Sequence, residues 1–148
     1  MARTERAGPP DEKVTINLGP VDLGKIDLLV SEGHFSSRTD LIRDAVRRML
    51  DEQGPAVKEA VVRRDMTVGL VVYGRKDLEA MVRKGKKLRT RVVGMLVLPS
   101  DITPELADKA FDEIAVHGIL RASKAVKDRL GSRIKKGSPV DSASNGEG

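Results

Sequence analysis

The segment Lys13-Val-Thr-Ile-Asn-Leu18 alternates between polar and apolar side chains, which is the pattern of a strand with one buried face. Its apolar face would carry Val14, Ile16 and Leu18, and its polar face Lys13, Thr15 and Asn17. Two helical patterns follow, so the strand has no partner within its own half of the chain. A second copy is the simplest source of a partner, and we therefore expect a homodimer.

A first helix is expected over residues 20–32, closed by Gly33, a residue that readily adopts the left-handed conformation common at helix ends. Its apolar positions fall on one helical stripe, formed by Leu23, Ile26, Leu29 and Val30.

A second helix is expected over residues 36–50. It opens with serine caps, and Asp40 follows Ser37 by three residues, as in a capping box. Its apolar stripe consists of Leu41, Ile42, Ala45, Val46, Met49 and Leu50.

The order of strand, helix, glycine-containing turn and serine-capped helix resembles the ribbon-helix-helix regulators of the CopG, Arc and MetJ group. The string Gly33-His-Phe-Ser-Ser-Arg-Thr-Asp-Leu-Ile-Arg-Asp-Ala-Val-Arg47 carries the resemblance best, and residues 11–53 contain all of it. The resemblance implies a dimeric β-α-α domain. Strands from two subunits would form an antiparallel ribbon that enters the major groove of DNA.

The resemblance also assigns roles to residues of this sequence. Base contacts are expected from Lys13, Thr15 and Asn17, whose donors and acceptors suit base edges. The start of the second helix would hold a DNA phosphate through the amides of Ser36, Ser37 and Arg38, with the Arg38 side chain as the best additional phosphate ligand. The expected dimer core contains Val14, Ile16, Leu18, Ile42 and Val46.

Two simpler interpretations of these residues stay open. Ser36 and Ser37 are helix caps in any fold, with or without a phosphate. Thr15 and Asn17 could be the solvent face of an edge strand, although Asn is a poor strand former.

The second helix should end at the Gly and Pro of residues 53–56, followed by a partly helical connector over 54–65. A weak internal repeat then follows over 67–72, 92–97 and 116–121. Each repeat has a glycine at its third position, and these are Gly69, Gly94 and Gly118, at nearly equal spacing. The similarity of three such short segments could also arise by chance.

Helix-prone stretches follow the repeats at 76–83, 103–113 and 124–130. The expected fold class is therefore α+β: a ribbon-helix-helix domain over 11–53 and a small α/β domain of strand-helix units over 66–133. By its position, the second domain would serve oligomerisation or sensing. A flexible arm over 1–10 and a disordered tail over 134–148 complete the expected organisation.

Composition agrees with a small cytoplasmic regulator. The 148-residue chain has no cysteine, and its net charge is +5, with the basic excess after residue 53. It shows neither an apolar run of membrane-spanning length nor the apolar centre of a signal peptide. A basic cluster could contact DNA or another polyanion, or could simply be a solvated loop. The cluster contains Arg83, Lys84, Lys86, Lys87, Arg89 and Arg91.

We expect no metal, cofactor or catalysis. The nickel-responsive ribbon-helix-helix repressors need several His and a Cys, whereas this chain has only His34 and His117. His34 is expected at the surface or in packing, and His117 within a strand. None of the common motifs for nucleotide binding, zinc hydrolysis or serine nucleophiles is present.

The sequence thus predicts a homodimeric, sequence-specific DNA-binding transcriptional regulator, with double-stranded DNA and a second copy as its partners. One alternative is an antitoxin that regulates its own operon while its C-terminal half neutralises a toxin. Another is a self-assembling scaffold in which the ribbon serves only as a dimer clip.

Overall fold

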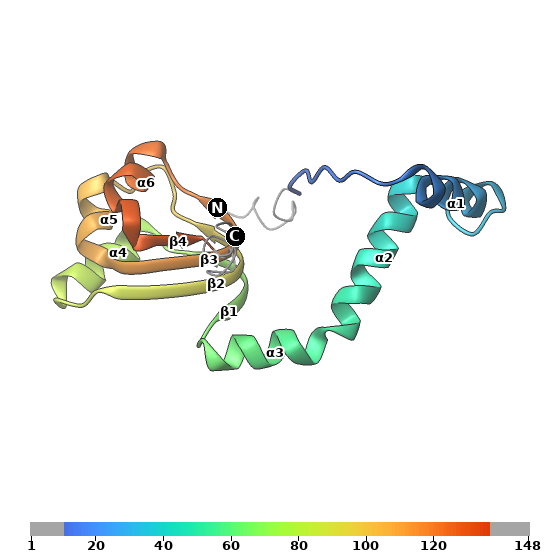
Figure 1. Cartoon of the computed structure of the whole chain (residues 1–148). Coiled ribbons are helices and arrows are strands. Elements are labelled where there is room, and N and C mark those ends of the chain that lie inside the picture. The colour runs from blue at the N-terminus through green and yellow to red at the C-terminus, as the bar shows by residue number, and fades with distance from the viewer. Residues whose placement is uncertain (1–10, 137–148) are drawn as a thin grey trace, which may run out of the picture. The chain divides into compact units, whose positions relative to one another are not determined.

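The computed structural model describes residues 11–136, and the chain divides into two compact units between Glu59 and Ala60 (Figure 1). We call them the N-terminal and C-terminal units. The expected arm over 1–10, and the part of the expected tail over 137–148, lie outside the described residues.

Helices make up the N-terminal unit. Helix α1 spans Pro20–Ser31, α2 spans Arg38–Glu52, and α3, Gly54–Arg63, begins in this unit and ends in the next. Gly33, with φ of 85°, ends the first helical segment in the left-handed conformation that the sequence predicts. The second helix ends as expected before Gly54 and Pro55, and the connector is helical over most of its length.

The expected strand over 13–18 is not formed in the single chain. Residues 11–19 have no regular secondary structure, and every one of them is exposed. A strand exists only through hydrogen bonds to a neighbouring strand, and one copy of residues 11–59 offers none. The single chain therefore does not confirm the expected β-α-α arrangement.

The C-terminal unit is a parallel sheet with the strand order β1-β2-β3-β4. The strands are β1 Thr67–Val72, β2 Leu88–Val97, β3 Phe111–Arg121 and β4 Ile134–Lys136. Helices α4 Arg75–Arg83, α5 Pro104–Ala110 and α6 Lys124–Leu130 connect them in turn, and a short 3₁₀ helix, Gly131–Arg133, precedes β4. The expectation of strand-helix units in this half is confirmed.

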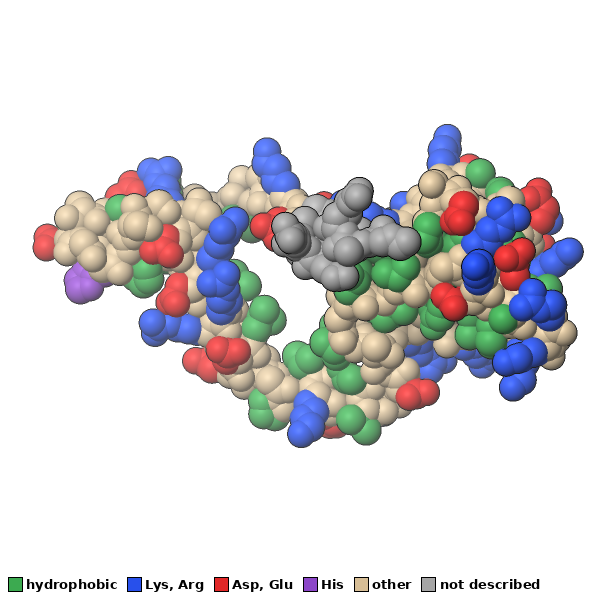
Figure 2. Space-filling model, turned by 180° about the vertical axis from the view of Figure 1, so that it is seen from behind, with side chains coloured by type: hydrophobic (Ala, Val, Ile, Leu, Met, Phe, Trp, Pro, Cys, Tyr) green, Lys and Arg blue, Asp and Glu red, His purple; other side chains and the backbone are tan. Residues whose placement is uncertain are grey.

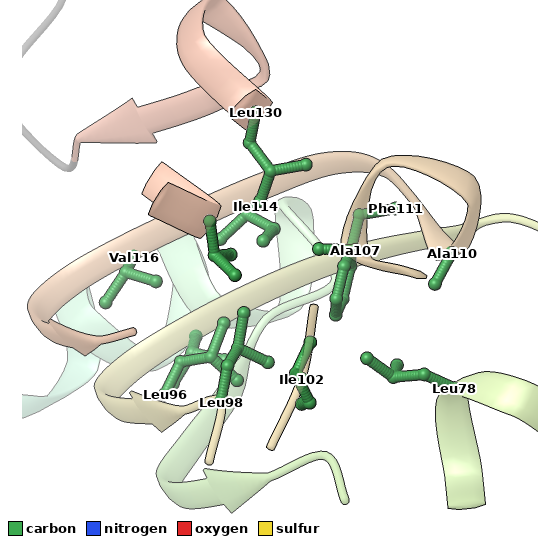
Figure 3. Packing of buried hydrophobic residues seen from close by; sticks show 12 residues of the cluster. Leu78, Leu96, Leu98, Ile102, Ala107, Ala110, Phe111, Ile114, Val116 and Leu130 are labelled. Atoms are coloured by element: carbon green, nitrogen blue, oxygen red, sulfur yellow. The ribbon is translucent and has the colours of Figure 1, made fainter. Parts of the chain in front are cut away.

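The core lies between the sheet and its helices (Figure 3). Leu78 of α4 and Ala107 of α5 are completely buried against alternate residues of the strands, such as Leu96 and Ile114. Because α5 packs against both α4 and α6, the helices form one layer on one face of the sheet. The core is aliphatic except for Phe111, as the scarcity of aromatic residues requires.

The three repeat glycines lie side by side in the sheet. Gly69 pairs with Gly94, and Gly94 pairs with Gly118. All three have positive φ, at 128°, 135° and 125°. A Cβ atom on Gly94 would lie 2.2 Å from the Gly69 carbonyl oxygen, and one on Gly118 would lie 2.0 Å from that of Gly94. At Gly94 and Gly118 the adjacent backbone thus leaves no room for a side chain, whereas nothing lies within 4 Å of a Cβ atom added to Gly69.

Two expected boundaries in the C-terminal unit are wrong. The helix expected over 103–113 ends at Ala110, because Phe111 and Glu113 pair with β2, and this strand pairing overrides local helical preference. The tail expected from residue 134 begins instead with strand β4, whose Ile134 pairs with Ile114 and packs against the core.

Candidate nucleic-acid interface

The helices of the N-terminal unit have no core in a single chain. No described residue of α1, α2 or α3 is buried. Apolar side chains stand at the surface along α2 and α3 (Figure 2). Among the expected dimer-core residues, Val14 is 79% exposed, Val46 52% and Ile42 only partly buried. Ile16 and Leu18 are also exposed. Apolar residues in a helical stripe normally face a core, so this surface is suited to burial against another protein surface.

The three expected base-contacting residues are all exposed. Lys13, Thr15 and Asn17 lie in the stretch without regular structure, so the single chain does not place them on one strand face. Their expected common face depends on strand formation, and hence on a partner strand.

The start of α2 is built by the residues that the sequence singles out. The Ser37 side chain caps the helix by accepting a hydrogen bond from the Asp40 amide at 3.0 Å. The carboxylate of Asp40 in turn accepts from the amide and the hydroxyl of Ser36, at 3.0 and 3.1 Å. The serine cap is confirmed.

This capping pattern leaves a specific set of free donors. The Ser36 amide, expected to hold a phosphate, already donates to Asp40. Within residues 11–136, the amides of Ser37 and Arg38 have no hydrogen-bond partner. Free amides at a helix start, together with the helix dipole, favour an anion, so these two amides retain the geometry for a phosphate.

Arg38 has an unexpected partner. Its Nε and Nη2 atoms donate to the two carboxylate oxygens of Asp27 in α1, at 2.7 and 2.9 Å. The hydrogen bond from Arg38 holds the pKa of Asp27 below its usual value. This ion pair joins α1 to α2. No periodic pattern predicts it, because the two residues lie on opposite sides of a turn.

The basic cluster of the C-terminal unit divides into two parts. Arg89 donates to Asp112 at 2.8 Å and Arg91 to Glu113 at 3.2 Å, both across the β2–β3 pair. The other members of the cluster are all exposed, and they lie in the last turn of α4 and in the turn that follows it. They are Arg83, Lys84, Lys86 and Lys87. We call these four the cationic turn. It is the part of the cluster with charge available for a polyanion.

The two histidines lie in different surroundings. His34 is exposed in the α1–α2 turn. His117 lies in β3, and its Nδ1 atom is buried without a hydrogen-bond partner within the described chain. No group of three potential metal ligands occurs among residues 11–136. In the same residues, no helix is both long and apolar enough to cross a membrane.

The model of a ribbon-helix-helix transcriptional regulator family matches residues 9–127. The match extends far beyond residues 11–53, through β1 to β3 and into α6, so it includes most of the C-terminal unit but not β4. Comparison with curated proteins and with solved structures gave no match.

Proposed function

Because the chain belongs to a ribbon-helix-helix transcriptional regulator family, we propose that it acts as a homodimer that binds specific DNA sequences. The observation that carries this proposal is the N-terminal unit without a core. Its helices present apolar stripes, yet none of their described residues is buried. A second copy would supply both the missing half of a core and the missing strand partner.

The proposed ribbon consists of residues 13–18 from both subunits. Pairing would turn Val14, Ile16 and Leu18 toward the helices and leave the polar residues facing outward, because side chains alternate along a strand. The outward set is Lys13, Thr15 and Asn17 from each subunit. Asn can pair with adenine through two hydrogen bonds, and Lys can donate to guanine.

The start of α2 is the proposed phosphate clamp. The amides of Ser37 and Arg38 are free to donate, and the positive end of the helix dipole favours a phosphate there. Phosphate contacts of this kind would fix the position of the ribbon in the groove without reading sequence. The proposed role is binding and not catalysis.

Site selection from a random duplex library tests the proposal. The intact protein should enrich a two-fold symmetric motif, because a symmetric dimer imposes matching half-sites. The double variant Thr15→Ala/Asn17→Ala should lose the motif while it keeps weak, salt-sensitive binding. The control Ser100→Ala, an exposed change in the C-terminal unit, should enrich the same motif as the intact protein.

Dimerisation through the N-terminal unit is tested by Val46→Asp. Val46 is half-exposed in the single chain, so a carboxylate there should leave the chain folded but should disrupt an apolar core between two copies. We expect the enriched motif to disappear with Val46→Asp and to persist with the apolar control Val46→Leu. Retention of the motif by Val46→Asp would exclude this mode of dimerisation.

The antitoxin alternative is not favoured by the C-terminal unit. Antitoxin segments that fold on binding lack a core of their own, whereas this unit buries Leu78, Leu96, Ile114 and other apolar residues. The scaffold alternative predicts assemblies that grow beyond closed oligomers and that have no preference for a DNA sequence. The library selection would reveal such a lack of sequence preference.

A further inference from the structure

The two edges of the parallel sheet differ in their protection. Within residues 11–136, β4 contributes three residues to its edge, and the exposed Lys135 stands on it. The β1 edge has six residues, Thr67-Val-Gly-Leu-Val-Val72, without a charge or a proline. Short length and lysine are the usual means by which a free edge resists pairing with another strand. The β4 edge has these features and the β1 edge has none.

The side chains of the edge strand β1 are more exposed than those of the interior strand β2. Leu70 is 54% exposed, whereas Met95, its partner on β2, is 5% exposed. Met95 has Leu70 on one side and Ile119 on the other. Among the described residues, Leu70 has a cross-strand neighbour on one side only. A further strand along β1 would cover Leu70 as the flanking strands cover Met95. Val68 and Val72, on the same face, are 64% and 52% exposed.

Unburied apolar side chains are concentrated in one stretch of the chain. Within residues 11–136, every large hydrophobic residue that is exposed lies between Val14 and Val72, and none lies in 73–136. The stretch runs without a break from the N-terminal helices through α3 to β1. In the proposed function its first part is covered by a second copy. Continuity along the chain indicates the same occupant for its last part.

We propose that β1 pairs in antiparallel fashion with β1 of a second copy across a two-fold axis, so that two sheets become one. This inference rests on the proposed dimer for the identity of the occupant. Centred on Leu70, the pairing places Leu70 opposite the partner's Leu70, and Val68 opposite the partner's Val72. Such a contact is isologous, so it closes after two copies and does not grow into a fibre. Cross-strand pairs of branched apolar residues stabilise it.

The tether between the units favours this pairing. Strand β1 begins at Thr67, shortly after α3 ends at Arg63. Once the N-terminal units hold two copies together, the β1 edges are confined near each other, which raises their effective concentration. The pairing is therefore tighter in the intact protein than without the N-terminal dimer, where it forms in proportion to protein concentration.

Disulfide capture tests the pairing directly, because the natural chain has no cysteine. In the full-length Leu70→Cys variant, the two thiols would meet across the two-fold axis at a Cα separation that a disulfide can span. We expect mild oxidation to convert most of this variant to a covalent dimer. The matched control is Lys135→Cys, on the opposite edge of the same sheet, and it should stay largely uncrosslinked. Equal yields for both variants would overturn the proposal.

A set of charge variants separates this proposal from the proposed function. Leu70→Lys should keep the enriched DNA motif, since it leaves the N-terminal unit unchanged. Val46→Asp should lose the motif but remain a concentration-dependent dimer by sedimentation, and Val46→Asp/Leu70→Lys should be a monomer. If Val46→Asp is as monomeric as the double variant, the β1 pairing is wrong and the proposed function is untouched. If Leu70→Cys crosslinks but the intact protein selects no motif, the pairing stands and the proposed function fails.

Discussion

Arg38 and Asp27 form a two-point ion pair that ties the start of α2 to α1 across the turn at Gly33. Both side chains are about half exposed, at 55% and 50%. Exposed ion pairs contribute little to the free energy of unfolding. The more important effect of this pair is expected on DNA binding. The side chain that the sequence predicts to contact a DNA phosphate is held by a carboxylate in the single chain.

Replacing the two partners separately should reveal which role Arg38 plays. Arg38→Ala should weaken binding to all DNA sequences alike and lower the slope of affinity against salt by about one. Asp27→Asn should strengthen binding, because it releases the guanidinium and removes a negative charge near the backbone. Titrations of labelled duplex at several salt concentrations measure both effects.

Asp22→Asn is the control for Asp27→Asn, since it removes a carboxylate from the same helix and leaves the Arg38 pair intact. It should raise affinity less than Asp27→Asn does. If Arg38→Ala and Asp27→Asn instead weaken binding equally, the pair acts only by holding the two helices in place.

The cationic turn of Arg83, Lys84, Lys86 and Lys87 should add affinity without adding specificity. The triple variant Lys84→Gln/Lys86→Gln/Lys87→Gln should bind long duplexes more weakly, with the salt slope reduced by about 0.9 for each lysine that meets a phosphate. The enriched motif should not change. Arg89→Gln is the control because Arg89 is paired with Asp112. Unchanged affinity in the triple variant would mean that the turn is only solvated.

Asp108 should make the C-terminal unit sensitive to acid. Its carboxylate accepts from Arg133 and, at 3.2 Å, from Arg129. The hydrogen bond from Arg133 is the main reason why the pKa of Asp108 lies below its usual 3.8, and Arg129 adds to the effect against the opposing effect of burial. A depressed folded-state pKa stabilises the fold above the usual pKa, and this contribution disappears as pH falls through the folded-state value.

Urea unfolding at fixed protein concentration measures this effect. Asp108→Asn should be less stable than the natural chain at pH 7, and the difference should shrink as the pH falls below about 3.8, the usual pKa. Comparing the two proteins at each pH cancels other carboxylates, such as Asp112, whose pKa is lowered by Arg89. In a background that carries Arg129→Gln and Arg133→Gln, Asp108→Asn should show no such pH-dependent difference, because neither side-chain donor to Asp108 remains. A constant gap for Asp108→Asn would contradict the assignment.

Local signals predicted the elements that depend on local interactions. The repeat over 67–72 coincides with β1, and the stretch over 124–130 coincides with α6. The structure adds that Ser123 caps α6. The Ser37 cap of α2 was predictable from the sequence. These caps and periods act within a few residues of each other.

What could not be predicted depends on partners distant in sequence. The local sequence predicts a helix at Phe111, and only its pairing with β2 shows that it belongs to a strand. Strand β4 has three residues within the described chain, too few for a clear alternating pattern. The Arg38–Asp27 pair joins two helices through a turn, and no periodicity reveals it. The expected strand over 13–18 is the opposite case: its pattern is clear, but a single chain lacks the partner that would form it.

Alanine in the row of repeat glycines should destabilise the C-terminal unit. For Gly94→Ala we expect a loss of about 1 to 3 kcal/mol in the free energy of unfolding, because a side chain is strained at positive φ. It should cost a further 1 to 3 kcal/mol, roughly, because the new methyl group is forced onto the Gly69 carbonyl. Gly118→Ala should behave alike against the Gly94 carbonyl. Urea unfolding measures the loss.

Gly69→Ala is the matched control, because Gly69 has a φ of 128° but nothing within 4 Å of an added Cβ atom. It should lose only the conformational part, about 1 to 3 kcal/mol. All three variants are best compared in the Leu70→Lys background, where β1 stays unpaired. If Gly94→Ala and Gly69→Ala are equally destabilised there, the close approach of the backbones is not what requires glycine, and φ alone accounts for the repeat.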